Sequence, residues 1–132
     1  MNIREINLET DHPMLTEWWG KWGWPALPKE MLPSTGYLAS WDDKPLMAGW
    51  LYMPSENTGI GWFEWAVSNP ESTSTERENS LKALTDMIDV VGTSKGLRLI
   101  FTSTNSKPFG DRLNRCGFNP TDQDVTIYMK HL

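Results

Sequence analysis

The chain has 132 residues, of which 39% are hydrophobic, and its formal net charge at pH 7 is −5. This length predicts a single domain with one hydrophobic core. The acidic balance argues against a nucleic-acid-binding surface, which needs a basic stripe. No apolar run approaches the ~20 residues of a membrane-spanning helix, and the N-terminal residues lack the basic and apolar regions of a signal peptide. We therefore expect neither a nucleic-acid partner nor a membrane partner.

The chain contains one cysteine and two histidines, so no cluster has the spacing of zinc ligands, and we expect no metal site. The single Cys116 excludes an internal disulfide and fits a reducing compartment, which predicts a cytoplasmic protein. The composition also includes eight tryptophans. A small domain needs such large side chains for its core, so packing is the expected role for most of them.

The predicted elements begin with a strand at 2–7, where apolar and polar residues alternate. A short helix with Pro13 at its first position follows, and a loop rich in proline and glycine then covers 20–36. Three strands joined by short turns are predicted at 36–41, 46–53 and 60–67. This pattern indicates an antiparallel meander.

A long amphipathic helix is predicted over 76–91, where apolar residues recur at helical spacing. The next strand, at 97–104, is reached across this whole helix, and a crossover of that length favours parallel pairing. A short helix within 107–118 and an alternating final strand at 124–132 complete the order. The order predicts an α/β (α+β) fold with a mixed sheet: an antiparallel meander, then a β-α-β crossover, with helices on both faces.

The segment 68–84 places a loop rich in serine, threonine and glutamate ahead of the long helix, and it contains no glycine. Free backbone N–H groups and the positive end of the helix dipole can hold a phosphate at such a place. Two pairs in the loop, Thr73 with Glu76 and Thr75 with Glu78, also have the spacing of a capping box. The residues by themselves leave both readings open, a phosphate site or a well-capped helix.

The order of elements and three local features resemble the GCN5-related N-acetyltransferases, the GNAT superfamily. The features are EWAVSNP at 64–70, a strand that ends near Asn105, and LNRCGF at 113–118, which is similar to the family's xYxxxGF helix end. The resemblance covers nearly the whole chain and implies one GNAT-like acyltransferase domain over 1–132. The tryptophan-rich N-terminal part and the short loops are similar to small acetyltransferase-like proteins of bacteriophages and their hosts.

The resemblance implies that acetyl-CoA binds as a co-substrate where the strands 60–67 and 97–104 splay apart. The pyrophosphate would then lie on the loop before the long helix. The family's loop pattern, (Q/R)-x-x-G-x-(G/A), falls on Thr73, Glu76 and Glu78, so all three signature positions are changed. The implied cofactor-binding residues are Ala66, Val67, Ser72, Thr73, Ser74, Thr75, Arg77, Asn79 and Asn105.

Acyl transfer to an amine needs a base, and the resemblance gives this catalytic role to Glu64 on the fourth strand. The aromatic neighbours in WFEW would raise the pKa of its carboxyl toward a useful range. Strict alternation places Ala66 on the same face as Glu64, and Val67 on the same face as Phe63. A carboxylate on the solvent face of a half-buried strand explains Glu64 equally well, so both readings stay open.

The family's acid tyrosine would stand at position 113, which is Leu113 here, and Tyr128 lies on the predicted last strand instead. Trp22, Trp24 and Trp62 are candidate substrate-binding residues, because aromatic faces stack on flat or cationic groups. We therefore predict an acetyl-CoA-dependent N-acyltransferase with an unknown amine acceptor. The alternative is a non-catalytic GNAT-like module that binds a protein partner, and the changed loop and missing tyrosine favour it.

Overall fold

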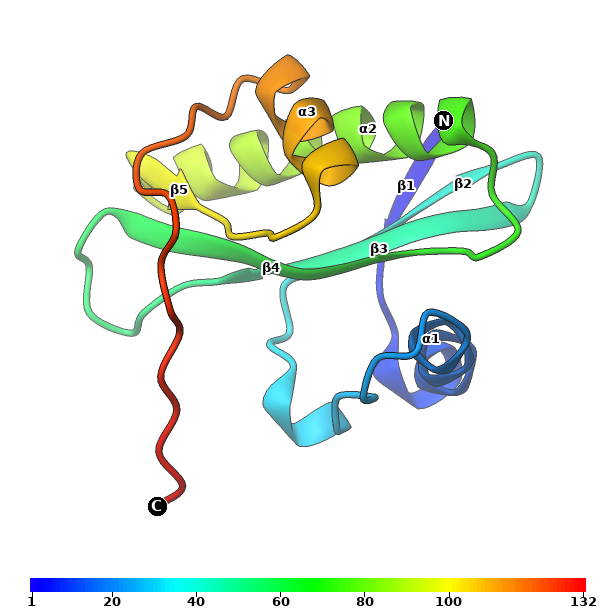
Figure 1. The fold of residues 1–132 in the computed structure, drawn as a ribbon, viewed down its shortest axis with the longest axis horizontal. Helices are drawn as coiled ribbons and strands as arrows, with labels where there is room; N and C mark the ends of the chain where they lie inside the picture. The colour runs from blue at the N-terminus through cyan, green and yellow to red at the C-terminus, as the bar shows by residue number, and fades with distance from the viewer.

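The computed structural model describes all 132 residues. Five strands form one mixed sheet in the order β1-β2-β3-β4-β5, with α1 on one face and α2 and α3 on the other (Figure 1). The elements are β1 (Asn2–Glu5), α1 (Leu8–Lys21), the 3₁₀ turn η1 (Lys29–Met31), β2 (Gly36–Trp41), β3 (Lys44–Tyr52), β4 (Ile60–Ser68), α2 (Ser74–Ser94), β5 (Leu99–Phe101) and α3 (Lys107–Arg115). The predicted mixed sheet with helices on both faces is confirmed.

Strands β1 to β4 are antiparallel neighbours, and β5 joins β4 in parallel. The β4–β5 pairing covers only three positions, from Ile60 opposite Leu99 to Trp62 opposite Phe101. Strand β4 continues to Ser68, whereas β5 ends at Phe101. The strand predicted at 97–104 is therefore confirmed as the neighbour of β4, but it is shorter than predicted because the two strands part after Trp62.

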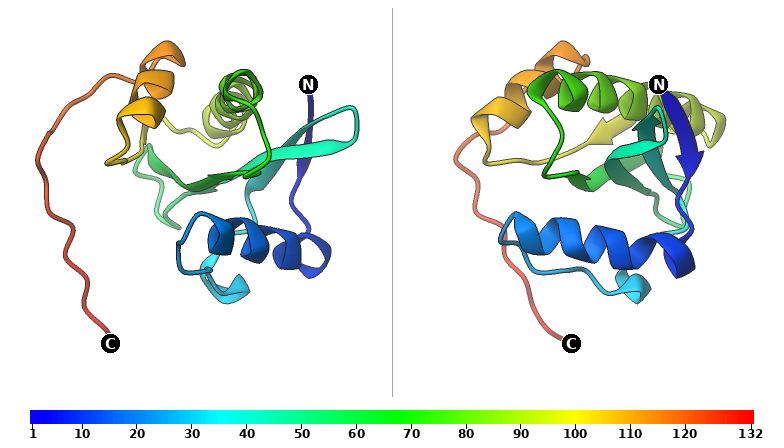
Figure 2. Two further views of the ribbon diagram at one scale, coloured as in Figure 1. Left: turned by 45° about the vertical axis from the view of Figure 1, so that its right-hand side comes forward. Right: turned by 90° about the vertical axis from the view of Figure 1, so that its right-hand side faces the viewer.

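Each face of the sheet carries its own apolar core, and the helices cover both (Figure 2). On one face, Leu81, Leu84 and Ile88 of α2 are fully buried, which confirms the predicted helical spacing. We call this the α2-side core; its strand members are Tyr37, Ala39, Met47, Leu51 and Phe63. The α1-side core joins Leu15, Trp18 and Trp19 of α1 to Leu32, Leu38, Ala48, Trp50 and Val67.

Helix α1 begins at Leu8, five residues before the predicted first position at Pro13, which lies inside the helix. The cap explains the earlier start, because the Asn7 side chain accepts a hydrogen bond from the Glu9 N–H at 3.0 Å. The buried Asp11 carboxylate also accepts bonds from the Asn7 N–H and from the Arg4 guanidinium, each at 2.8 Å. None of the helices combines the length and the apolar composition that a membrane crossing requires.

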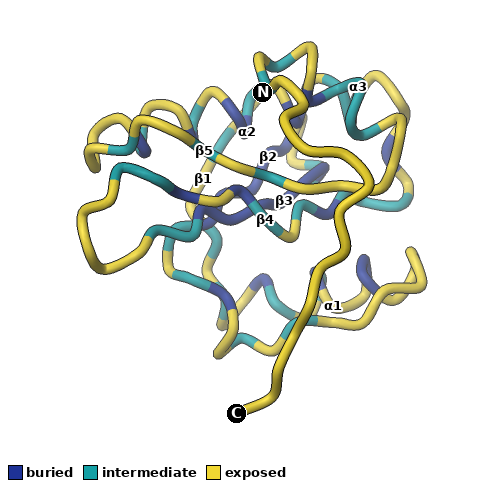
Figure 3. Tube along the Cα trace, turned by 60° about the vertical axis from the view of Figure 1, so that its left-hand side comes forward, coloured by how far each residue is buried: buried dark blue, intermediate teal, exposed yellow.

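The strand predicted at 124–132 is absent. Residues 119–132 run as an extended segment away from α3, all of them exposed, and no hydrogen bond joins them to the sheet (Figure 3). Alternation shows which side chains could share a face, but a strand also needs a neighbouring backbone to satisfy its N–H and C=O groups. Because no such neighbour lies beside this segment, the prediction is wrong for the single chain.

Candidate functional site

A β-bulge interrupts β4 at Trp65 and Ala66, where two residues of β4 stand opposite the single Gly49 of β3. Trp65 has a φ of 61°, in the left-handed region that large side chains seldom adopt. A glycine is required on the neighbouring strand, because a Cβ at position 49 would lie 2.3 Å from the Phe63 ring. Bulges of this kind redirect side chains and end regular pairing.

Because of the bulge, the faces of β4 predicted for Ala66 and Val67 are wrong. Strict alternation places Ala66 with Glu64 and Val67 with Phe63, but Val67 lies in the α1-side core and Phe63 in the α2-side core. Ala66 packs against the α2-side core as well. The extra residue at the bulge reverses the alternation from Ala66 onward. The whole Val67 residue is only 1% exposed, and it pairs with Ala48 of β3, so neither its side chain nor its backbone is open to a ligand.

Glu64 is half-buried on the α1 side of β4, opposite Trp50 of β3. Burial raises the pKa of its carboxyl, and an interaction with the Ser103 side chain opposes this rise in part. Ser103 follows the end of β5, so the carboxyl lies where β4 and β5 part. The raised pKa of Glu64 and its main cause, burial, agree with the prediction, whereas the interaction with Ser103 was not predicted.

Aromatic side chains border Glu64 on three neighbouring strands. Trp62 of β4 stacks on Phe101 of β5 with 6.2 Å between ring centroids, and both side chains are about two-fifths exposed. Tyr52 stands opposite Trp62 on β3, and its hydroxyl donates to the Met31 carbonyl oxygen at 2.7 Å. Burial raises the pKa of Tyr52, and the charge of Glu64 adds to this rise. The carboxylate therefore has an apolar, partly open border.

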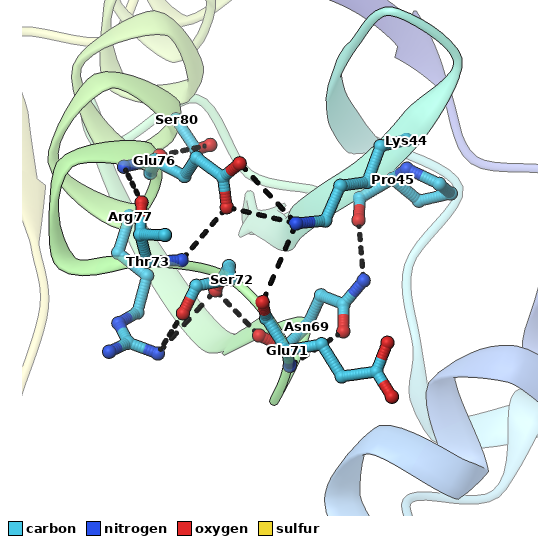
Figure 4. A network of polar contacts seen from close by, with 9 residues as sticks. All are labelled: Lys44, Pro45, Asn69, Glu71, Ser72, Thr73, Glu76, Arg77 and Ser80. Atoms are coloured by element: carbon cyan, nitrogen blue, oxygen red, sulfur yellow. Dashed lines mark hydrogen bonds and ion pairs between the residues drawn. The ribbon is translucent and has the colours of Figure 1, made fainter.

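The loop before α2 is tied to the start of β3 by Asn69 (Figure 4). The Asn69 side-chain amide donates to the Pro45 carbonyl oxygen at 2.9 Å, and its backbone N–H donates to the Leu46 carbonyl oxygen at 2.8 Å. The Ser72 N–H donates to the Asn69 carbonyl oxygen at 2.9 Å, and the Ser72 residue is buried. These bonds give the loop a defined shape without any glycine.

The capping box predicted for Thr73 and Glu76 is confirmed (Figure 4). The Thr73 hydroxyl accepts from the Glu76 N–H at 3.1 Å, and the Glu76 carboxylate accepts from the Thr73 N–H at 2.8 Å. That backbone bond and the Lys44 ammonium, 3.1 Å away, lower the pKa of Glu76. The box leaves the backbone N–H groups of Ser74 and Thr75 without a partner in the chain.

Two arginines of α3 reach the start of α2. Arg115 donates two hydrogen bonds to the Glu78 carboxylate, at 2.6 and 2.7 Å, and this pairing lowers the pKa of Glu78. Glu78 therefore does not cap the helix with Thr75, the other pair with capping-box spacing. Arg112 donates to the Ser74 hydroxyl at 3.1 Å, and its buried Nε makes no hydrogen bond but lies 3.5 Å from the Glu78 carboxylate as an ion pair. Sequence analysis missed Arg112, because only the packing of α3 against α2 brings it to this place.

The predicted substrate-binding tryptophans do not come together. Trp22 lies at the far end of β4, where its indole N–H donates to the Ser68 carbonyl oxygen at 2.8 Å. Trp24 stacks on Trp22 with 5.7 Å between centroids, and the Arg77 guanidinium lies 5.8 Å from the Trp22 centroid. Ser68 and Trp62 are six positions apart along the strand, roughly 20 Å. Trp22 and Trp24 thus belong to the surroundings of the loop, whereas Trp62 borders Glu64.

Among the remaining predicted residues, only Arg77 contacts the same loop. Arg77 donates to the Ser72 carbonyl oxygen at 2.9 Å, in addition to its position over Trp22. Asn79 is exposed on α2, and Asn105 is exposed between β5 and α3. No group of three or more aspartate, glutamate, histidine or cysteine side chains is arranged to hold a metal ion.

No protein-family model matches the chain, and no curated protein matches it in sequence. Solved structures do match it. An acetyltransferase from Trypanosoma brucei has a TM-score of 0.67 at 18% identity, covering 97% of this chain and 99% of its own. The aminoglycoside N-acetyltransferase AAC(6')-Iy in complex with CoA has a TM-score of 0.67 at 19% identity, covering 99% and 100%. Rv2747 from Mycobacterium tuberculosis, also with CoA, has a TM-score of 0.68 at 16% identity, covering 96% and 76%. These similarities concern the fold.

Proposed function

Because the chain has the fold of the GCN5-related N-acetyltransferases, we propose that it is an acetyl-CoA-dependent N-acyltransferase that acts on an amine. The observation that carries the proposal is the position of Glu64, a half-buried carboxyl with a raised pKa at the point where β4 and β5 part. Two structures of this fold, Rv2747 and AAC(6')-Iy, contain CoA, which supports the choice of donor. The suggested similarity to bacteriophage proteins stays a prediction.

The start of α2 fits the pyrophosphate of CoA. The free N–H groups of Ser74 and Thr75 lie at the positive end of the helix dipole, where anions are favoured. The Arg112 guanidinium donates to the Ser74 hydroxyl at 3.1 Å, and its Nε makes no hydrogen bond although it lies 3.5 Å from the Glu78 carboxylate, so it brings positive charge to these N–H groups. A capping box and a phosphate site are therefore compatible here, because the box uses other N–H groups.

The glutamates at the family's glycine positions weaken this site less than their charges suggest. Glu76 is paired with Lys44 at 3.1 Å, and Glu78 is paired with Arg115 at 2.6 Å. Each carboxylate thus has a compensating cation. Arg112 also lies 3.5 Å from the Glu78 carboxylate, and Arg77 adds a further positive charge near the loop. The altered signature is consistent with binding through side chains in place of a glycine-rich backbone.

Bound acetyl-CoA supplies a thioester, whose C–S bond breaks as the amine nitrogen bonds to the carbonyl carbon. Glu64 accepts the proton of the attacking amine, and its raised pKa suits that role. Trp62 and Phe101 border the carboxylate and offer aromatic faces to a cationic acceptor before it loses its proton. The backbone of Ala66, within the bulge, is the proposed contact for the pantetheine arm.

A second candidate function is a non-catalytic module that binds a protein partner. The observation that favours it is Leu113, which is buried in the α2-side core at the position of the family's acid tyrosine. Tyr128 does not replace that tyrosine, because it is 90% exposed on the C-terminal segment. Catalysis without an acid remains chemically reasonable, since a thiolate is a fair leaving group.

Two measurements test the proposal. Acetyl-CoA at 100 times its dissociation constant should stabilise the folded domain by about 2.7 kcal/mol, visible as a rise in Tm. Acetyl transfer to a panel of polyamines and peptides should then be measured for the wild type, for Glu64→Gln and for the control Tyr128→Phe. We expect loss of rate only in Glu64→Gln. No stabilisation by acetyl-CoA or CoA would refute donor binding, and stabilisation without transfer to any acceptor would favour the binding module.

A further inference from the structure

The C-terminal segment 124–132 has the composition of a buried strand but no partner in its own chain. Its apolar side chains are strongly exposed: Val125 is 65% exposed, Ile127 79% and Met129 81%. The segment carries no backbone hydrogen bond to the rest of the protein. Contiguous exposed apolar side chains of this kind mark interaction surfaces in folded proteins.

The outer edge of β5 is also without a partner. Strand β5 ends the sheet and pairs only with β4, so the N–H and C=O groups on its other side are free. Leu99 is 56% exposed and Phe101 40% exposed on this strand. An open apolar edge is a template for one more strand, and natural proteins usually cover it.

The segment does not lie along its own β5. Helix α3 ends at Arg115, Gly117 follows its cap with a φ of 95°, and the Phe118 N–H donates to the Leu113 carbonyl oxygen at 3.0 Å. Phe118 packs against the α2-side core, which holds the start of the segment in place. From there the chain runs across the layers, from the α3 side of the sheet to the α1 side, and ends apart from the body of the protein (Figures 1 and 2).

We propose that the segment 124–132 of one molecule pairs with the free edge of β5 in a second copy of the chain, and that the second copy returns the same contact. The alternation along the segment places Val125, Ile127 and Met129 on one face, which suits burial beside the apolar edge. Reciprocal exchange gives a closed two-fold dimer and leaves neither the edge nor the segment exposed. The partner on this surface is therefore another molecule of this protein.

Cysteine trapping distinguishes a second copy from the same chain. In a Cys116→Ser background, one protein carries Leu99→Cys, and a second carries Val125→Cys, Ile127→Cys or Met129→Cys in turn. A disulfide needs Cα atoms about 4.4–6.8 Å apart. On mild oxidation of the mixed proteins, we expect a disulfide-linked pair of different chains for at least one tail position. A third set of proteins carries Leu99→Cys and one tail cysteine in the same chain. If only these double variants react, as monomers with an internal disulfide, or if nothing reacts, the exchange is refuted.

Light scattering on the intact protein gives an independent measure. The wild type should have the mass of a dimer, and Ile127→Asp should reduce that mass twofold because a charge replaces an apolar contact. Lys130→Asp, on the other face of the segment, is the matched control and should remain dimeric. Both variants should keep the fold, since neither side chain contacts the body of the protein. A wild type that is still monomeric at the protein concentration used for trapping would also overturn the proposal.

Discussion

Replacing Arg112 by glutamine tests the proposed donor site directly, because the packing of α3 on α2 places this arginine at the start of α2. Its guanidinium donates to the Ser74 hydroxyl at 3.1 Å, and the side chain is only 14% exposed. A phosphate bound by the free N–H groups of Ser74 and Thr75 would lie within a few ångströms of that charge. Arg112→Gln keeps much of the side-chain length and removes the charge.

The expected loss follows from the separation and the surroundings. Two unit charges roughly 5 Å apart interact by about 1 kcal/mol in water and about 3 kcal/mol at the dielectric of a protein surface. The dissociation constant of CoA should therefore rise roughly 5- to 150-fold in Arg112→Gln. Glu78→Gln should change affinity in the opposite direction, because it removes a nearby negative charge and releases Arg112 and Arg115.

Isothermal titration with CoA measures these constants, and Lys107→Gln is the matched control. Lys107 lies on the same helix, is 86% exposed and pairs with Asp111, so its loss should leave CoA affinity unchanged. Equal affinity of the wild type and Arg112→Gln would refute the assignment of Arg112. An equal loss in Lys107→Gln would show that only the overall charge of the protein matters.

Three further outcomes are expected. Glu64→Gln should lower the rate of acetyl transfer by roughly 10²–10⁴-fold. It should also raise the free energy of unfolding at neutral pH, because folding raises the pKa of Glu64 and so disfavours its charged form. This stabilisation should disappear as the pH falls and the wild-type carboxyl becomes protonated. Thr73→Ala should cost about 1 kcal/mol and lower the Tm by about 3–5 °C, whereas Thr75→Ala, outside the capping box, should not; equal shifts in calorimetry would contradict the cap. Asp11→Asn should lower the free energy of unfolding by about 1–3 kcal/mol near pH 7 in urea, since Asp11 accepts two hydrogen bonds from Arg4. That pairing lowers the pKa of Asp11 in the folded state, so the loss should shrink as the pH falls through this folded-state pKa. A loss that does not depend on pH would contradict the ion pair.

Periodicity and local spacing in the sequence determined the layers of this fold and the start of its long helix. Leu81, Leu84 and Ile88 recur at helical spacing, and all three are fully buried against the sheet. Thr73 with Glu76 and Thr75 with Glu78 both have the spacing of a capping box, and the first of these pairs forms one. Both features are readable because the residues involved lie within a few positions of one another, so their geometry follows from the helix itself.

Features whose partners lie far apart in the chain were decided only by the tertiary structure. The bulge at Trp65 depends on Gly49 of the neighbouring strand, and no local sequence pattern predicts a tryptophan with positive φ. Arg112 reaches Ser74 from 38 positions away, through the packing of α3 on α2. The segment 124–132 has the alternation of a strand, yet it forms none in the single chain, because a strand exists only where another backbone satisfies its N–H and C=O groups.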